Sequence, residues 1–489
     1  MKNLEKHFES FRKNIVGINT SYSSPFGEKK IIYADWIASG RLYAPIEDRI
    51  KNSFGPFVAN THTETSETGT IMTYAYHYAH KMIKKHVNAG PDDVIITPCS
   101  GMTGAINKFQ RILGLKIQSR TIKKIDIKEE DRPVVFVTHM EHHSNHTSWY
   151  ETIADVIVLN PGKDLLVDPD ELRKEIKKFD KRKFKIGSFS ACSNITGLKP
   201  PYYELAKIMH ENGGLAFIDF AASAPYVDID MHPEDPLKKL DAVFFSPHKF
   251  LGGPGSSGVL IFDKSLYNND VPDNPGGGTV DWTNPWGEYK YMDDIELRED
   301  GGTPGFLQAF RAAMAIKLKE KMGTENIEER ENELLQKAFP LMEEIPGLQI
   351  LAKQHKERLG IISFYFPKIH YNLVVKLLSD RFGIQVRGGC ACAGTYGHFL
   401  FNVTHDESRH ITEMINRGDF SEKPGFVRLS LHPTMTDSEL EYIVESLTQI
   451  AEKIDEWSND YEYSSTTNEF YYKGSFENSK DFYKSWFEI

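Results

Sequence analysis

The sequence FFSPHKFLGGPGSSGVLIF, residues 244–262, joins two apolar runs through a lysine and a glycine-rich turn. Lys249 stands where the first run ends, with Ser246 and His248 beside it. Burying an ammonium group costs several kcal/mol unless the charge is paired or neutralised. A lysine can be neutralised covalently, because its amine condenses with an aldehyde to form a Schiff base. Taken alone, the segment is equally compatible with a surface lysine at the end of a strand.

Seven apolar runs of this type occur between residues 93 and 262, and helical patterns separate several of them. They are rich in Val, Ile and Phe and lack polar alternation, as strands buried on both faces do. The runs are DVIIT (93–97), PVVFVT (133–138), DVIVL (155–159), KIGSFS (185–190), LAFID (215–219), AVFFS (242–246) and GVLIF (258–262). This strand–helix alternation predicts an α/β layer with a mostly parallel sheet flanked by helices.

Two helices carry start signals. Asp168 is the expected N-cap of a helix over residues 168–179, with Pro169 in the first helical position and Glu171 completing a capping box. Thr436 and Glu439 form the capping box of a final helix over residues 436–454. Its apolar face is expected to contain Leu440, Ile443, Val444, Leu447 and Ile454.

The pattern changes after about residue 305, where long amphipathic helices and shorter mixed elements follow. We expect an N-terminal helical segment (1–30), a large α/β domain (31–304) and a smaller α+β domain (305–457). The smaller domain includes a cysteine-containing loop at 386–398. The tail (458–489) is aromatic and polar without a clear period, so it is either disordered or packed on the body through its aromatic side chains.

Charge and composition exclude several classes of protein. The 489 residues carry a net charge of −11, which argues against a general nucleic-acid or anionic-membrane surface. No apolar run reaches about 18 residues, so no spanning helix is expected. The charged N-terminal segment has no apolar core of a secretory signal. Four cysteines do not make a disulfide framework, and a reducing cytoplasm is expected.

Polar residues follow the predicted strands, at the sheet edge where open α/β folds bind ligands. Ser100, Gly101 and Thr103 open a helix after the run 93–97, and this pattern suits either an anion site or an ordinary N-cap. Four histidines follow the run 133–138. They are His139, His142, His143 and His146. No cysteine or carboxylate stands at a typical partner spacing, so a zinc site is weakly supported.

An aspartate and a lysine end two of the buried runs. Asp219 ends the run 215–219, and Lys249 follows the next run thirty residues later. A buried carboxylate needs a partner. Together with a phosphate-type helix terminus, the pair suggests pyridoxal 5′-phosphate (PLP), whose ring nitrogen the acid would keep protonated and whose aldehyde the lysine would bind.

Ordered motifs over roughly residues 30–455 carry a family resemblance. The chain resembles class V aminotransferase-fold enzymes (fold type I) of the cysteine desulfurase and selenocysteine lyase branch. The motifs are YADWIASGR, SGMTGAIN, MEHHSNHTSW, SNITG, IDFAASAP, SPHKFLGGPGSSG, PGGGTV, EDGGTPG, VRGGCACAG and VRLSLHPTMT.

The resemblance implies a PLP site and a homodimer. It makes Lys249 the Schiff-base lysine and proton shuttle, Asp219 the partner of the pyridine nitrogen, and His142 the ring that stacks on the cofactor. Asn194 would reach the cofactor O3′ and the substrate carboxylate. The implied phosphate-binding residues are Gly101, Met102, Thr103, Ser246 and His248, with Thr279 reaching the neighbouring subunit's phosphate.

The resemblance also implies the substrate chemistry. Arg428 would grip the substrate α-carboxylate, and Cys392 matches the nucleophile that takes sulfur from L-cysteine as a persulfide and leaves L-alanine. Arg387 would help to hold the thiolate and contact the substrate. Cys390 is an extra thiol or a small apolar filler.

Departures from the family pattern leave alternatives open. Ala222 stands where the branch commonly has a glutamine that donates to O3′. A selenocysteine lyase, another PLP-dependent C–S lyase or an aminotransferase would use the same fold. From another class, a noncatalytic metal or redox protein would use Cys390, Cys392 and His398, although these make an incomplete zinc set. The sulfur acceptor protein is not named by the sequence.

Overall fold

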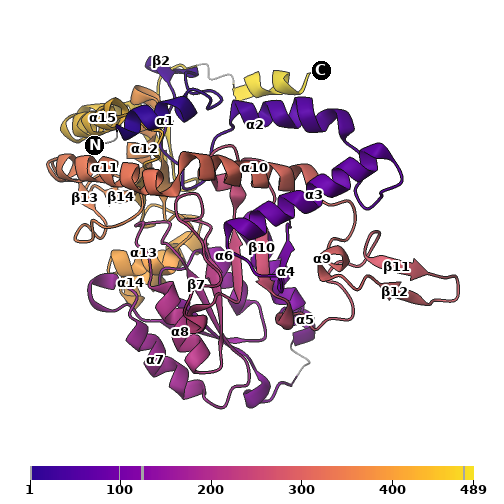
Figure 1. Ribbon diagram of the computed structural model, residues 1–489. Coiled ribbons are helices and arrows are strands. Elements are labelled where there is room, and N and C mark those ends of the chain that lie inside the picture. Colours follow the sequence, from indigo (N-terminus) through magenta and orange to yellow (C-terminus); the bar gives the residue numbers. More distant parts are fainter. Residues whose placement is uncertain (1–2, 99, 123–125, 477–479, 489) are drawn as a thin grey trace. The chain divides into compact units, whose positions relative to one another are not determined.

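The computed structural model describes residues 3–98, 100–122, 126–476 and 480–488 (Figure 1). The chain forms two compact units, and both are discontinuous in sequence. Unit 1 contains residues 1–13, 17–36 and 330–489, whereas unit 2 contains residues 14–16 and 37–329. The predicted boundary at 304/305 lies within unit 2, and the four-part division of the chain stays a prediction.

Unit 2 is built on a seven-stranded sheet in the order β4-β10-β9-β8-β7-β5-β6. Its strands are β4 (Asp93–Ile96), β5 (Val134–Thr138), β6 (Asp155–Leu159), β7 (Lys185–Ser190), β8 (Leu215–Asp219), β9 (Ala242–Phe245) and β10 (Val259–Asp263). All seven predicted strands are present. The strands β6, β5, β7, β8 and β9 pair in parallel, and only β10 runs antiparallel to both of its neighbours, β9 and β4. The predicted mostly parallel sheet is confirmed.

Helices cover both faces of this sheet, which is why its strands read as continuous apolar runs. On one face, Val135, Ile186, Phe217 and Phe244 pack against α4 (Gly101–Ile112) and against Trp149 of α6 (His143–Tyr150). On the other face, Gly187 lies beside Met209 of α8 (Tyr202–Glu211), and Phe136 contacts Phe179, which follows α7 (Pro169–Ile176). Further elements of unit 2 are α2 (Ala44–Arg49), α3 (Glu67–His86), α5 (Ser119–Ile122), α9 (Ile295–Arg298), α10 (Phe306–Met322), and the hairpin of β11 (Val280–Thr283) and β12 (Tyr289–Tyr291), which projects beside α9 in Figure 1.

The two predicted capping motifs have different outcomes. Thr436 and Glu439 form the expected capping box of α15 (Asp437–Trp457). Asp168 caps α7 by accepting from the Asp170 amide, but Glu171 does not complete a box, because its carboxylate accepts from the Asn160 side chain at 3.0 Å. Glu171 therefore bonds to Asn160, which follows β6, and not to the N-cap backbone that the local sequence pattern predicted as its partner.

Unit 1 contains a four-stranded antiparallel sheet in the order β13-β14-β17-β16. Its elements are α1 (Leu4–Arg12), β1 (Ser21–Ser24), β2 (Gly27–Lys30), β3 (Ile32–Tyr33), β13 (Gln349–Ile350), β14 (Ile361–Tyr365), α12 (Tyr371–Phe382), β15 (Ile384–Gln385), β16 (Arg387–Gly389), α13 (Gly394–Leu400), α14 (His405–Asn416), β17 (Phe426–Ser430) and α15. Helix α11 (Thr324–Glu343) begins in unit 2 and continues into unit 1. The N-terminal segment belongs to this unit partly because β3 pairs in parallel with β15.

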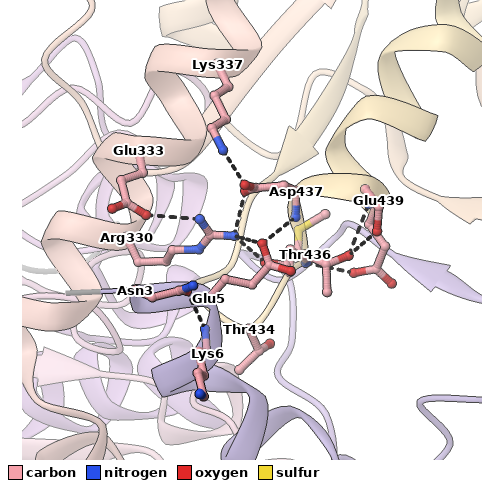
Figure 2. Close-up of polar contacts among 12 residues, drawn as sticks. Asn3, Glu5, Lys6, Arg330, Glu333, Lys337, Thr434, Thr436, Asp437 and Glu439 are labelled. Atoms are coloured by element: carbon pink, nitrogen blue, oxygen red, sulfur yellow. Dashed lines mark hydrogen bonds and ion pairs between the residues drawn. The ribbon is translucent and has the colours of Figure 1, made fainter. Parts of the chain in front are cut away.

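A buried arginine of α11 joins the first turns of α1 and α15 (Figure 2). Arg330 of α11 is 1% exposed and donates to Glu333, to the Met435 carbonyl and to Asp437 at the start of α15. Glu5 of α1 lies 3.5 Å from the same guanidinium and also accepts from the Asp437 amide. The N-terminal helix is thus fixed to the C-terminal part of the chain by charge as well as by its apolar face.

The tail residues that the structure describes are ordered into elements. β18 (Tyr461–Ser464) and β19 (Glu469–Tyr472) form an antiparallel hairpin, and residues Lys480–Phe487 form a 3-10 helix. Within unit 1 the hairpin packs through aromatic rings, with the His370 ring centroid 5.1 Å from that of Tyr463 and 5.3 Å from that of Phe470. Of the two possibilities for the tail, packing through aromatic side chains describes this hairpin. Among the described residues, none of the helices combines the length and the apolar character needed to cross a membrane.

Candidate active site

The carboxyl ends of β5, β7, β8 and β9 bring acids and a lysine into one region of unit 2. Asp219 ends β8 and is 4% exposed, and its Oδ1 accepts from the Ala221 amide at 2.8 Å. Burial raises the pKa of Asp219 to about 7, while the Ala221 amide and the ammonium of Lys249 act to lower it and Glu141 acts to raise it. The two residues that the sequence paired, Asp219 and Lys249, therefore interact electrostatically.

Glu141, between β5 and α6, is a fully buried carboxylate with five donors. It accepts from the amide and hydroxyl of Thr138 and from the amide and hydroxyl of Ser190, at 2.6 to 3.2 Å. The fifth donor is the side chain of Asn145, at 2.7 Å. These contacts join the ends of β5 and β7 and fix the start of α6, where His142 is the N-cap and accepts from the Ser144 amide through Nδ1.

A sharp turn lies at the start of α4 and, with Ser246 and His248, forms what we call the α4 cup. Ser100 and Gly101 both have positive φ, 73° and 60°, which turns the chain sharply into the helix. The Met102 amide donates to Ser246 Oγ at 2.9 Å. A Cβ placed on Gly101 would come within 3.0 Å of Ser246 Oγ and 3.6 Å of the His248 ring, so only glycine leaves this space open. Helix N-termini with free amides and hydroxyls suit phosphate groups.

The surroundings of this cup also fit a phosphorylated ligand. The hydroxyls of Ser256 and Ser257 are buried, and within the described part of the chain neither has a hydrogen-bond partner. Thr103 of α4 shares a 2.6 Å hydrogen bond with Ser144 of α6. Burial, together with the neighbouring Lys249, lowers the pKa of His248 to about 4, so this ring stays neutral at physiological pH. These donors suit the phosphate of PLP, and the Asp219 carboxylate suits its pyridine nitrogen as an acceptor.

Two other predicted cofactor residues lie in loops of unit 2. Asn194 is 7% exposed and lies in a turn after β7, in which Ser193 Oγ accepts from the amides of Ile195 and Thr196. Thr279 is fully buried just before β11, and its hydroxyl donates to the Gly276 carbonyl at 2.7 Å. Within its own chain Thr279 thus closes a glycine-rich loop, and its role toward a neighbouring subunit stays a prediction.

Unit 1 holds the predicted substrate arginines. Arg428 of β17 is 3% exposed and donates to Asp35 Oδ1 at 2.8 Å, while Arg387 of β16 donates to Asp35 Oδ2 at 3.1 Å. Burial lowers the pKa of Arg428, while Asp35 acts to raise it. One carboxylate therefore orients both guanidinium groups, and the arginine pair retains a net positive charge that suits a substrate carboxylate.

The cysteine loop follows β16 directly. Cys392 is exposed and Cys390 is half-buried. The backbone is unusual here, because Ala391 and Cys392 have φ values of 48° and 56°. His398 uses both ring nitrogens, one toward the Gly394 carbonyl at 2.8 Å and the other toward Ser408 Oγ at 2.9 Å. That arrangement does not favour His398 as a metal ligand.

The structure adds two acids that the sequence argument did not select as site residues. Asp35 accepts hydrogen bonds from the predicted site residues Arg387 and Arg428. Glu141 joins the ends of β5 and β7 to α6, directly before His142, and its charge acts to raise the pKa of Asp219. Each acid lies within three residues of the end of a short apolar strand, and Asp219 was selected from the sequence because it ends such a strand. The same rule applied to IIYAD and VVFVTHME would have flagged them, since an acid at the end of a buried strand needs partners.

Curated relatives match most of the chain. A probable cysteine desulfurase of Halalkalibacterium halodurans is 29% identical over 367 residues, which cover 74% of this chain and 84% of that protein. A probable cysteine desulfurase of Staphylococcus epidermidis is 29% identical over 370 residues, with 75% and 84% covered.

Solved structures share the fold. An apo cysteine desulfurase from Thermococcus onnurineus superposes with a TM-score of 0.72 at 22% identity, covering 91% of this chain and 98% of that one. A cysteine desulfurase from Escherichia coli gives a TM-score of 0.71 at 20% identity, covering 93% and 99%. The model of the aminotransferase class-V family matches residues 32–443, and this chain belongs to that family.

Proposed function

We propose that this chain is a PLP-dependent cysteine desulfurase. It would convert L-cysteine to L-alanine and keep the sulfur as a persulfide on Cys392. The observation that carries the proposal is the exposed thiol of Cys392 on the loop after β16, a strand whose Arg387 shares the Asp35 carboxylate with the buried Arg428, in a chain of the class-V aminotransferase family. The probable cysteine desulfurases among its relatives support the same chemistry.

Unit 2 supplies the residues that would hold PLP. The Gly101–Met102 turn with Ser246, Thr103 and His248 would bind the phosphate, and Asp219 would face the pyridine nitrogen. The lysine at the end of β9, Lys249, would attach the cofactor and then move a proton at the substrate Cα. When bound, PLP withdraws electrons from the substrate carbon.

Asp219 would act by charge. With a pKa near 7 the free carboxyl is half-ionised at neutral pH, and a protonated pyridine nitrogen beside it would favour the ionised form, because opposite charges stabilise each other. His142 would cover one face of the ring, with its Nδ1 engaged by the Ser144 amide. Asn194 would contact the O3′ side and the substrate.

Unit 1 supplies the residues that would act on L-cysteine. Arg428, oriented by Asp35, would bind the α-carboxylate, and Arg387 would add positive charge beside the thiol. The Cys392 thiolate would attack the substrate sulfur. A new S–S bond forms, the substrate Cβ–S bond breaks with its electron pair going to carbon, and protons complete L-alanine. We also propose a homodimer and an external sulfur acceptor protein.

The test uses purified, PLP-loaded protein and L-cysteine without added keto acid. We expect L-alanine and an equal first-turnover amount of sulfur on Cys392, located by peptide mass spectrometry. Lys249→Ala should lose the visible absorbance of the lysine-bound cofactor and release no alanine. Alanine formation that requires a keto acid would indicate an aminotransferase, and alanine release without bound sulfur in the first turnover would indicate a different C–S lyase.

A further inference from the structure

The tail hairpin lies outside the part of the chain that the family model matches, which ends at residue 443. It nevertheless contacts α12 of unit 1, the helix that also contacts β16. Tyr461 of β18 donates to Asp380 of α12 at 3.0 Å, and Arg381 pairs with Asp460 just before the hairpin. The hairpin is therefore fastened along the helix by polar contacts at its base.

Asn468, in the hairpin turn, fastens the other end of the hairpin to the start of α12. Its Nδ2 donates to the Tyr371 hydroxyl at 2.7 Å, and its Oδ1 accepts from the Tyr463 hydroxyl at 2.9 Å. Its carbonyl accepts from the Asn372 side chain at 2.5 Å. The residue has a φ of 59°, a conformation that asparagine and glycine adopt more readily than other residues.

Tyr371 and Asn372 in turn pack against the two strands beside the cysteine loop. A Cβ on Gly425, which leads into β17, would overlap the Tyr371 ring. A Cβ on Gly388 of β16 would fall on the Asn372 side chain and within 3.1 Å of the Tyr371 ring. Burial raises the pKa of Tyr371, and the nearby Cys390 adds to the effect, so the hydroxyl that Asn468 holds lies close to the loop.

The loop needs such support because its backbone is strained. Gly389, Ala391 and Cys392 have φ values of 114°, 48° and 56°. Left-handed non-glycine residues cost of order 1–3 kcal/mol each and persist only where the surrounding structure imposes them. Here β16 is held between β17 and the start of α12, and Asn468 holds the start of α12.

We propose that the tail hairpin is a positioning element for the cysteine loop, with Asn468 acting through Tyr371 and Asn372. It keeps β16 and the strained turn after it in the conformation that presents the Cys392 thiol. The role of Cys392 in this proposal rests on the proposed function. The support that the hairpin gives to the loop through α12 does not depend on that function.

The test compares Asn468→Gly and Tyr371→Phe with wild type in the full-length, PLP-loaded protein. Asn468→Gly keeps the backbone conformation and the carbonyl that Asn372 uses, while it removes the side-chain contacts to Tyr371 and to Tyr463. Tyr371→Phe removes only the hydroxyl at the other end of that contact. Thr466→Ala is the matched control, because the Thr466 hydroxyl contacts Ser464 inside the same turn at 3.0 Å.

Two readouts are needed. We expect amide hydrogen exchange in residues 386–393 to quicken at least fivefold in both variants and to stay unchanged in Thr466→Ala. We expect kcat for alanine release from L-cysteine to fall at least fivefold with KM within twofold, and the double variant to be no worse than either single one.

The outcomes separate the two proposals. Unchanged exchange in both variants overturns the brace. Faster exchange with normal kcat overturns the positioning role. If wild-type protein releases no alanine from L-cysteine, the proposed function fails, whereas the exchange measurement still decides whether the hairpin braces the loop.

Discussion

At the scale of single residues, Asp219 shows how burial sets the charge of a site before any ligand binds. Its carboxyl ends a strand that is buried on both faces, and one amide and one lysine do not offset the lost hydration. The acid therefore carries a cost in the cofactor-free fold that a cationic ligand would remove. A protonated pyridine that binds beside Asp219 would therefore also remove the free-energy cost of the buried carboxylate.

We predict that Asp219→Asn stabilises the cofactor-free protein at high pH. The folded pKa is about 7 and the ordinary value is 3.8, so the folded state holds the proton more tightly and wild-type stability falls as the pH rises between these values. The shift corresponds to at most about 4 kcal/mol, at about 1.36 kcal/mol per pH unit. Urea unfolding at pH 4.5 and 8 should show a gain for the variant that grows with pH.

The exposed acid Asp180 provides the control for this measurement. Asp180→Asn should leave the pH dependence of unfolding as in wild type. The same gain for Asp219→Asn at both pH values would mean that its carboxyl is not protonated in the fold.

We predict that the two loop thiols differ in function. Cys392→Ser should abolish persulfide formation from L-cysteine, whereas Cys390→Ser should keep a substantial part of it, because Cys392 is exposed and Cys390 is half-buried. A nucleophile must lie near van der Waals distance of the atom that it attacks, so two positions along the loop are not equivalent. Mass spectrometry after a pulse of L-cysteine locates the sulfur. Sulfur on Cys390 that survives in Cys392→Ser would contradict the assignment.

At the scale of elements, the sequence predicted those strands and helix starts that depend on local residue patterns. The seven strands of unit 2 and the cap of α15 follow from apolar runs and from a capping box, and the structure has them. The antiparallel direction of β10 was not predictable, because apolar content does not encode strand direction. Asp35 lies more than 350 positions before each of the two arginines that it orients, so these pairings depend on tertiary structure.

The tail illustrates a second limit of sequence patterns. Tyr461, Tyr463 and Phe470 alternate with polar residues too weakly to identify two strands, and the partners that order them lie in α12. A hairpin of four-residue strands is marginal without such packing. From composition alone, the tail (458–489) was therefore as compatible with disorder as with packing on the body of the protein.

We predict that Arg330→Met destabilises the protein by about 2 to 3 kcal/mol, because it leaves the carboxylates of Glu5, Glu333 and Asp437 without their shared cation. Figure 2 shows these carboxylates around the guanidinium. Lys337, which also pairs with Asp437 but is 48% exposed, provides the matched control. Lys337→Met should cost less than about 1 kcal/mol. Urea unfolding followed by circular dichroism measures both, and equal losses would show that the buried arginine has no special role.

At the scale of the whole molecule, we predict that active sites are shared between two copies of the chain through Thr279. Thr279→Ala and Lys249→Ala chains, each carrying a different affinity tag, would be co-expressed and the mixed dimer isolated. If Thr279 serves the neighbouring site, the mixed dimer contains one intact site and regains about half of the wild-type alanine release. No recovery would mean that Thr279 acts within its own chain, and a monomer with full activity would exclude sharing altogether.

The discontinuity of unit 1 has a consequence for synthesis on the ribosome. Leu4, Phe8 and Phe11 of α1 are buried in a unit whose remaining part begins at residue 330. At about 5–20 residues per second, the first segment waits roughly 15 to 60 seconds for its partners to emerge. During this interval unit 2 can fold co-translationally while α1 exposes its apolar face. A nascent chain halted near residue 329 should therefore recruit chaperones through its N-terminus, and release of the full-length chain should end that association.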